Sequence, residues 1–291
     1  MAIASLLPNS LLASEEKTKV GPLIGVAHGE RSKLVKAALD VLGGIDKFVK
    51  PGEHIYIKPN IAFASDFNSG AMTSPDITKQ LVQLCLDAGA AKVVIIEHTI
   101  HDAGLCVEKS RISEALVDKK RTKLITLTKE QQFTQTEIPK GKELKSVKVA
   151  KLLDDADKLI NLPVAKSHGQ TGVSLGLKNR MGLIWDRGYL HRINLNQAIA
   201  DLATAIRSDL TIVDATNVLI TGGPAGPGKT VQLNTVIAGT DVVAVDSYTV
   251  SIAKWYNRSF TGNQVKHIVA ASELGLGEME TAKMVVKEIG V

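Results

Sequence analysis

Cysteine is scarce in this 291-residue chain, which contains Cys85 and Cys106 and no C-x-x-C pair. Two thiols cannot supply the four ligands of an iron–sulfur cluster or of a cysteine zinc site. We therefore expect no iron–sulfur cluster within this chain. Cys85 lies in an apolar run at residues 81–86, which is typical of a buried core thiol, and a disulfide between the two cysteines stays open.

The chain also has few aromatic residues, only a small excess of one charge over the other, and no long apolar runs after its first residues. Aromatics make up 4% of the chain, and 35 basic residues stand against 30 acidic ones, giving a net charge of +5. This composition, without an arginine-rich run, argues against a nucleic-acid-binding surface. No run after Ala13 is long and apolar enough to cross a membrane, and 44% hydrophobic content is ordinary for a soluble globular protein.

The first residues leave two interpretations open. Residues 1–13, MAIASLLPNSLLA, have the length and polarity of the apolar part of a signal peptide. The basic residues that precede such a part are absent, since the first lysine is Lys17. We expect residues 1–20 to be either an N-terminal arm or the remnant of a leader, so the protein is either cytoplasmic or exported to the periplasm.

Strand-like and helix-like segments alternate along the rest of the chain. Apolar β-branched runs predict strands, and apolar stripes at helical spacing beside capping residues predict helices. The alternation predicts an α/β fold, a mostly parallel sheet with helices on both faces. Predicted strands are residues 23–27, 54–61, 92–97, 123–128, 158–162, 210–214, 231–238 and 284–289; predicted helices are 31–42, 75–87, 107–121, 194–206, 241–255 and 264–274. Residues 21–291 form one domain in this interpretation, with a boundary within 129–148 if there are two α/β lobes.

The strongest functional signal is the segment at residues 161–182, NLPVAKSHGQTGVSLGLKNRMG. A core element does not need Lys166, His168 and Lys178 beside a glycine-rich bend. A bend that enters a helix, expected here near Ser174, is a natural site for an anion, because backbone N–H groups face the ligand. The alternative is a surface turn with solvated lysines.

The residue types in this segment suggest roles. Histidine exchanges protons near neutral pH, and a lysine binds anions or, with a lowered pKa, acts as a base. The predicted catalytic residues are His168, Lys166 and Lys178. The predicted ligand-binding residues of the same segment are Gly169, Thr171, Gly172, Ser174 and Asn179.

Two further strand ends carry polar residues. Lys58–Pro59–Asn60 follows the predicted strand 54–61, and ligands of α/β sheets bind at the carboxyl ends of strands, so we expect Lys58 and Asn60 at the same site. Glu97 and the residues after it, EHTIHD, carry two histidines and two carboxylates. Such a set can ligate a divalent metal, although short loops often carry histidine by chance. The metal candidates are His98, His101 and Asp102.

The segment GPAGPGKT at residues 223–230 matches the P-loop pattern of nucleotide-binding proteins. Pro224 and Pro227 remove two of the N–H groups that such a loop offers to phosphates. The following VQLNTVIAG predicts a strand, whereas a P-loop requires a helix there. The sequence favours a hairpin loop, or a loop that closes over the ligand site with Lys229 adding charge.

Together these motifs resemble the domain of unknown function family number 362. The resemblance rests on KPN, the segment 161–182, DLTIVDA, GGPAGPG, GTDVVAVDS and ELGLGEME, in this order between residues 21 and 289. It implies that Asp214, Asp241 and Asp246 belong to the ligand site with the residues named above. Many members carry a ferredoxin-like cysteine module, which this chain lacks. The order of His168, a glycine–serine turn and Lys178 is also distantly similar to the lactate racemase family, whose members use a nickel pincer cofactor.

Three functions remain open at this point. The first is an enzyme that holds a small carboxylate or phosphate with lysines and moves its protons with His168. The second is a protein that binds an anionic ligand or cofactor without chemistry. The third is a redox accessory protein whose iron–sulfur partner is a separate chain. The cofactor, the substrate and any partner protein are unknown from sequence.

Overall fold

A ten-stranded sheet forms the centre of the protein in this computed structural model, which describes residues 21–291. Neighbouring strands follow the order β12–β1–β11–β10–β7–β2–β3–β4, and β8 and β9 branch from β10. Among the described strands, β11 and β9 are antiparallel to their neighbours and the other pairings in this sheet are parallel. The strands are β1 (Leu23–His28), β2 (His54–Lys58), β3 (Lys92–Glu97), β4 (Thr122–Thr126), β7 (Lys158–Asn161), β8 (Val164–His168), β9 (Gly172–Ser174), β10 (Leu210–Leu219), β11 (Thr230–Gly239) and β12 (Val285–Gly290). The prediction for residues 1–20 lies outside the described residues.

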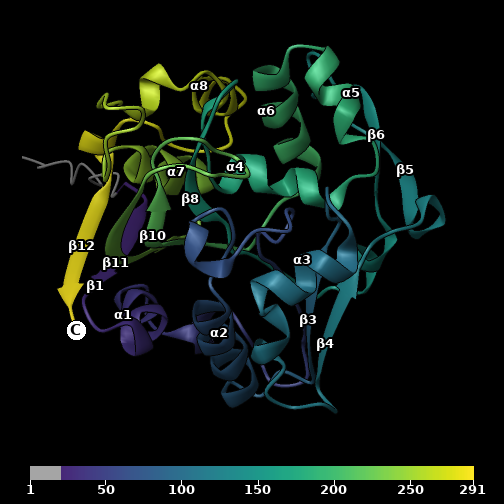
Figure 1. Cartoon of the computed structure of the whole chain (residues 1–291), viewed down its shortest axis with the longest axis vertical. Coiled ribbons are helices and arrows are strands. Elements are labelled where there is room, and N and C mark those ends of the chain that lie inside the picture. Colours follow the sequence, from purple (N-terminus) through teal and green to yellow (C-terminus); the bar gives the residue numbers. More distant parts are fainter. Residues whose placement is uncertain (1–20) are drawn as a thin grey trace, which may run out of the picture.

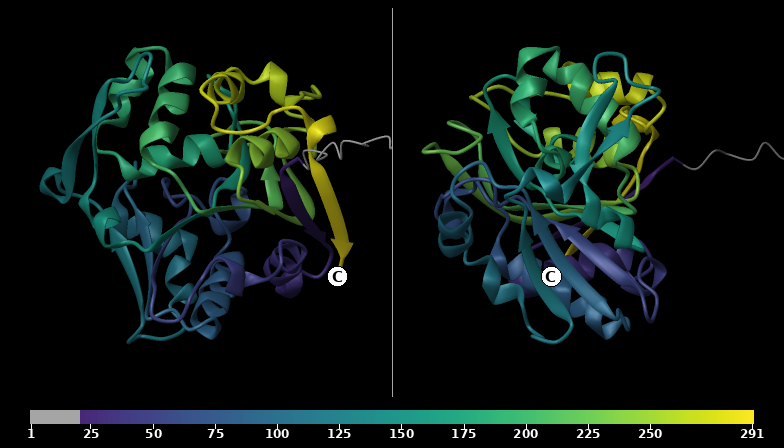
Figure 2. Two further views of the ribbon diagram at one scale, coloured as in Figure 1. Left: turned by 180° about the vertical axis from the view of Figure 1, so that it is seen from behind. Right: turned by 90° about the vertical axis from the view of Figure 1, so that its right-hand side faces the viewer.

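Helices cover both faces of this sheet (Figure 1). On one side lie α1 (Leu34–Val41), α2 (Pro75–Asp87) and α3 (Ala103–Ser110). On the other lie α4 (Gly176–Asn179), α5 (Arg187–Arg192), α6 (Leu195–Ala205), α7 (Val242–Val250) and α8 (Lys266–Glu273). Views from behind and from the side show the same two layers (Figure 2). The predicted fold class, α/β with a mostly parallel sheet, is confirmed.

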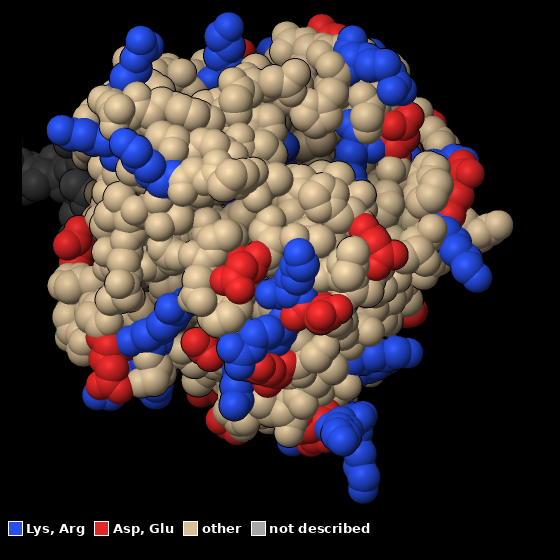
Figure 3. Space-filling model, in the orientation of Figure 1, with Lys and Arg blue, Asp and Glu red and all other residues tan. Residues whose placement is uncertain are grey.

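Charged side chains of both signs are mixed on the surface. On the face drawn in Figure 3, Lys and Arg lie beside Asp and Glu over the lower half of the molecule. Exposed pairs such as Arg111–Glu114, with 2.6 Å between nitrogen and oxygen, each contribute at most about 1 kcal/mol. No helix within residues 21–291 is long and apolar enough to cross a membrane.

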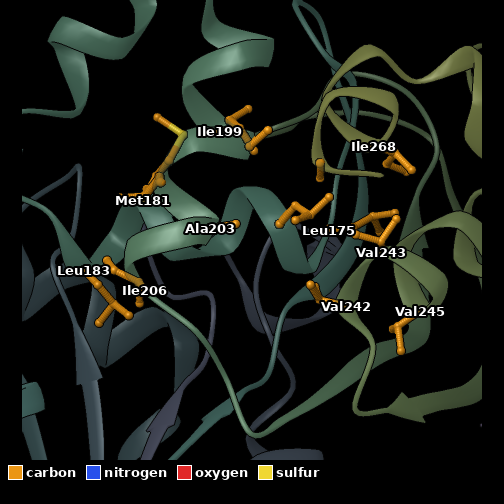
Figure 4. Packing of buried hydrophobic residues seen from close by; sticks show 14 of the residues in the cluster. Leu175, Met181, Leu183, Ile199, Ala203, Ile206, Val242, Val243, Val245 and Ile268 are labelled. Atoms are coloured by element: carbon orange, nitrogen blue, oxygen red, sulfur yellow. The ribbon is translucent and has the colours of Figure 1, made fainter. Parts of the chain in front are cut away.

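Two hydrophobic cores lie on opposite sides of the sheet. Leu34, Leu39 and Leu81 belong to the core under α1 and α2 and are fully buried, because the apolar stripes of these helices face the sheet. The second core packs Leu175 and Val243, with their neighbours from α6 and α8, against the other face (Figure 4). Burying each such side chain contributes roughly 1.5–3 kcal/mol. The cores fix the strand ends at which the polar residues lie.

Several predicted elements differ from the structure, among them the strand 210–214, which continues to Leu219, and the helix 241–255, which ends at Val250. The strand predicted to reach Ile61 ends at Lys58, because Pro59 has no N–H to continue the ladder. The helix predicted over residues 107–121 begins at Ala103 instead, where Asp102 accepts the Leu105 N–H at 2.9 Å. It ends at Ser110, and the next residue is left-handed with φ 57°. The helix predicted near Ser174 begins at Gly176, because Ser174 is still in β9.

A separate hairpin occupies most of the stretch 129–148 and continues to Ala150. Its strands are β5 (Phe133–Glu137) and β6 (Ser146–Ala150), which pair with each other outside the main sheet. Phe133, Val147 and Val149 are buried in the core that also contains α6. A lobe boundary in this stretch, and hence the division of residues 21–291, stays a prediction.

The two cysteines are free and buried. Burial raises the pKa of the Cys85 thiol to about 12 and that of Cys106 to about 11. Both are therefore protonated at neutral pH, and a protonated buried thiol is a poor nucleophile and a poor metal ligand.

Candidate functional site

The carboxyl ends of β2, β3 and β7 meet at one edge of the sheet, where they border a cavity of about 180 Å³. Lys58 is level with Asn161 in the register of β2 and β7, and Glu97 ends β3. β8 follows directly and adds Lys166 and His168. The cavity is lined by Lys58, Asn60, Ala62, Phe63, Glu97, Ile100, Lys166, His168, Ser174, Lys178, Asn179, Met181, Gly182, Arg187, His191 and Pro224.

A buried ion pair lies at the base of this cavity. Lys58 Nζ lies 2.8 Å from Glu97 Oε2 and 2.5 Å from the Pro59 carbonyl oxygen, and both charged side chains are at most 1% exposed. The same carboxylate oxygen accepts the Ile61 N–H at 3.0 Å. Glu97 Oε1 has no hydrogen-bond partner within residues 21–291. Burial lowers the pKa of Lys58, and Glu97 opposes that shift.

Three asparagines, Asn60, Asn161 and Asn179, hold the strand ends together. Asn179 Oδ1 accepts from Asn60 Nδ2 at 2.9 Å and from Lys58 Nζ at 3.3 Å. Asn179 Nδ2 donates to the Lys58 carbonyl at 3.0 Å and to Asn161 Oδ1 at 2.8 Å. These bonds fix the end of α4 against β2 and β7. They also leave Asn60 Oδ1 free to accept from another donor.

Lys166 is that donor. Its Nζ lies 2.8 Å from Asn60 Oδ1 and 2.5 Å from the Ala71 carbonyl oxygen, and 4.9 Å from the centre of the Phe63 ring. The residue is 1% exposed and forms no ion pair with a described carboxylate. Burial, followed by repulsion from Lys178, holds the pKa of Lys166 well below its ordinary value.

Lys178 and Arg187 also face the cavity without a carboxylate partner among the described residues. The nearest hydrogen-bond partner of Lys178 Nζ is Met181 Sδ at 3.6 Å. Arg187 donates to the carbonyl oxygens of His98 and Thr99, each at 2.5 Å. Burial and the neighbouring Arg187 lower the pKa of Lys178 to about 8, so it is mostly protonated at pH 7. On the surface, by contrast, several basic side chains pair with acidic ones, as Lys33 does with Glu30 and Arg121 with Asp118.

The two histidines of the cavity differ in tautomer. His168 Nδ1 accepts the Gln170 N–H at 3.2 Å, so in the neutral ring the hydrogen is on Nε2. His191 Nδ1 lies 2.6 Å from Gln170 Oε1, an acceptor, so Nδ1 carries the hydrogen and Nε2 has the lone pair. Burial and then Lys178 lower the pKa of His168 to about 3, and the same two causes lower that of His191. The ring centres are 6.3 Å apart.

The GPAGPGKT loop lies against this cavity. Pro224 belongs to the lining, the Gly223 N–H donates to Ser167 Oγ at 3.1 Å, and Ser65 Oγ donates to the Ala225 carbonyl at 2.9 Å. The loop is followed by β11 and not by a helix. The loop therefore lacks the helix N-terminus with which a P-loop holds phosphates. Lys229 is exposed and is not among the residues that line the cavity.

Three predicted ligand-binding aspartates lie outside the cavity lining and bind backbone N–H groups. Asp246 accepts from the first two residues of α4 at 2.8 and 2.7 Å. Asp241 caps α7 and also accepts the Glu278 N–H at 2.9 Å. Asp214 accepts the Ser74 N–H at 2.7 Å. These contacts give the three aspartates a structural use.

Three of the predicted bend residues and the metal candidates are also outside the cavity lining. Ser174 is in the lining, whereas the lining omits Gly169, Thr171 and Gly172. Each predicted metal candidate has its own contact: His98 bonds the Ile184 carbonyl and stacks on Trp185, His101 accepts the Ala64 N–H, and Asp102 caps α3. Within residues 21–291 no group of three or more His, Cys, Asp or Glu side chains is placed to hold a metal ion.

Arg187 and His191 are two titratable cavity residues that sequence reasoning missed. They are four apart on α5, so they face the same side of that helix. Asp186 caps the helix by accepting the Tyr189 N–H at 2.8 Å. The signal was therefore present as a capping aspartate followed by Arg and His at helical spacing, directly after the segment 161–182.

The match to a family model agrees with the resemblance to family 362 seen in the motifs. A thylakoid-associated protein, sll1697, of Synechocystis sp. is 25% identical over 220 residues, which cover 73% of this chain and 66% of that protein. The lactate racemase apoprotein from Thermoanaerobacterium thermosaccharolyticum is similar in structure with a TM-score of 0.48 and 17% identity, covering 74% of this chain and 53% of that one. The family described as Domain of unknown function (DUF362) matches residues 55–251, and the protein belongs to this family.

Proposed function

We propose that the protein binds a small carboxylate- or phosphate-bearing molecule in this cavity and transfers a proton to or from it. The observation that carries the proposal is that Lys178 and Arg187 line the cavity with neutral partners only. Removing an unpaired charge from water costs several kcal/mol, and an anion between these two side chains offsets that cost. The cavity of about 180 Å³ is smaller than the roughly 300–1,000 Å³ of sites for drug-sized ligands, which favours a small acid.

The two histidine tautomers supply the proton chemistry. His191 has a lone pair at Nε2 that can take a proton from the ligand, and His168 Nε2–H can donate a hydrogen bond to it. Both rings are neutral at pH 7 because burial, and then the surrounding cations, lower their pKa values. An anionic ligand reduces the repulsion from Lys178 and makes protonation of His168 easier. Ligand binding thereby prepares the histidine for proton transfer.

The binding part is tested by calorimetric titration with malonate and with inorganic phosphate. We expect Lys178→Met and Arg187→Met to weaken binding about 10- to 100-fold, since a hydrogen bond to a charged group contributes roughly 1.5–3 kcal/mol. Lys151→Met, at an exposed lysine outside the cavity, is the matched control and should bind as the unaltered protein does. Equal affinity in all three variants would show that the cavity is not the binding site.

The proton-transfer part needs no knowledge of the product. The protein is incubated in D₂O with malate, succinate, aspartate or tartrate, and loss of carbon-bound hydrogen is followed by NMR. We expect exchange for at least one acid, and its loss in His168→Gln and His191→Gln with affinity retained. Binding without exchange of any acid would favour a protein that holds an anion without chemistry.

A further inference from the structure

Lys166 differs from the other basic residues of the cavity in the number and kind of its partners. A neutral amine has two N–H groups and one lone pair, whereas an ammonium group has three N–H groups. The two oxygens at 2.8 and 2.5 Å, from Asn60 and Ala71, are both uncharged and match the two N–H groups of a neutral amine. The lone pair is then free on the side chain that borders the cavity. No carboxylate among the described residues pairs with Lys166.

From this arrangement we infer that Lys166 is a nucleophilic amine that forms an imine with the carbonyl carbon of a small 2-oxo acid. The inference rests on the proposed function, because the acid's carboxylate is held by the same cations. The depressed pKa of Lys166 agrees with it, since burial and Lys178 favour the uncharged amine.

The other two lysines are unsuited to this role. Lys58 is 2.8 Å from Glu97, and that carboxylate favours its charged form and opposes the lowering of its pKa by burial. Lys178 has a pKa of about 8 and is mostly protonated at pH 7, which suits it to hold an anion. The three lysines of the cavity therefore have different roles: Lys58 is structural, Lys178 binds the carboxylate and Lys166 attacks the carbonyl.

The step balances without an added reactant. The Lys166 lone pair attacks the carbonyl carbon, and the C=O π bond breaks to give an alkoxide, to which the His168 Nε2–H donates a hydrogen bond. The nitrogen passes one proton to His191 Nε2, and the resulting imidazolium gives that proton to the alkoxide, which becomes the hydroxyl of a carbinolamine. The C–O bond then breaks as the nitrogen forms the C=N bond, and the second N–H proton, again carried by His191, leaves with the hydroxyl as water, so amine and ketone give imine and water. A proton from water gives the protonated imine, whose single N–H can donate to Asn60 Oδ1.

The inference is tested by trapping the imine. The protein is incubated with pyruvate and sodium cyanoborohydride at pH 7, and the reduced adduct is located by intact mass and peptide mapping. We expect a single adduct on Lys166, its absence in Lys166→Arg, and its persistence in Lys151→Met. No adduct, an adduct on Lys178, or an even distribution over exposed lysines would overturn the inference.

The Asn60→Asp variant tests whether Lys166 reacts as a nucleophile or has only a packing role. The new carboxylate would accept from the same Nζ and favour the ammonium form, so the pH at which half-maximal adduct forms should rise. An unchanged pH profile in Asn60→Asp would contradict the role of Lys166 as the attacking amine. Malonate has no reactive ketone, so its titration separates the two proposals: normal malonate binding without any adduct removes the imine alone, and absent malonate binding removes the proposed function.

Discussion

Replacing Glu97 by glutamine isolates the charge of the buried carboxylate at the base of the cavity. The amide oxygen can still accept from Lys58 Nζ and from the Ile61 N–H, which lie 2.8 and 3.0 Å from the same carboxylate oxygen. The shape and these two bonds are therefore retained. The negative charge is lost, and Lys58 at 1% exposure has no other carboxylate partner in the described chain.

The free energy of unfolding that Glu97→Gln should lose can be worked out for two cases, with Lys58 charged and with Lys58 neutral. Removing one partner of a buried pair costs about 3–5 kcal/mol, because the other charge stays buried. Lys58 can avoid this by releasing its proton at pH 7, which costs about 1.4 kcal/mol for each of the roughly 3.4 units between 10.4 and 7. Both cases give a destabilisation of about 3–5 kcal/mol. At higher pH the loss should shrink, because releasing the proton becomes easier.

Urea unfolding measures this difference. Glu114→Gln is the matched control, since its partner Arg111 is exposed and the pair lies 2.6 Å apart on the surface. We expect the control to lose at most about 1 kcal/mol. A Glu97→Gln loss as small as that of the control would refute the reasoning that the cavity buries an obligatory ion pair. Lys58→Met combined with Glu97→Gln should recover part of the stability.

Three further changes have expected outcomes in the same unfolding assay. Gly182→Ala should destabilise by about 1–3 kcal/mol, because the added Cβ would lie 2.0 Å from Glu97 Oε1, whereas Gly169→Ala, with nothing within 4 Å, should not. Asp246→Asn should cost about 1–3 kcal/mol, because one of the two N–H groups that begin α4 loses its acceptor. Burial lowers the pKa of His267 to about 3 while the unfolded chain titrates near 6.5, so stability should fall by about 1.4 kcal/mol per pH unit as pH drops from 6.5 towards 3. In His267→Leu this slope should be smaller, and an unchanged slope would contradict the assignment.

The sheet could be predicted from the sequence where its strands are buried on both faces. Residues 92–97 have the bounds predicted for them, because an apolar β-branched run is what a strand between two layers requires. β8 could not be recognised, because Lys166 and His168 interrupt the apolar pattern of a strand that is nevertheless fully buried. A buried lysine can be predicted only when the groups that accept its hydrogen bonds, here Asn60 and Ala71, are known.

The candidate site was located by polar residues at strand ends, but their uses depend on contacts between distant segments. Lys58 and Lys178 line one cavity, as expected when the carboxyl ends of neighbouring strands meet. A motif does not reveal whether a carboxylate faces a ligand or a backbone N–H. For this reason Asp241 and Asp246 were expected at the ligand, whereas in the structure they fix the starts of α7 and α4.

A crystal structure of the protein grown with malonate tests the central claim most directly, because the ligand has two carboxylates and no other reactive group. We predict malonate inside the cavity, with a carboxylate oxygen about 2.7–3.2 Å from both Lys178 Nζ and the Arg187 guanidinium. Malonate found only on the outer surface, with water alone between these two side chains, would contradict the claim that the cavity is an anion site.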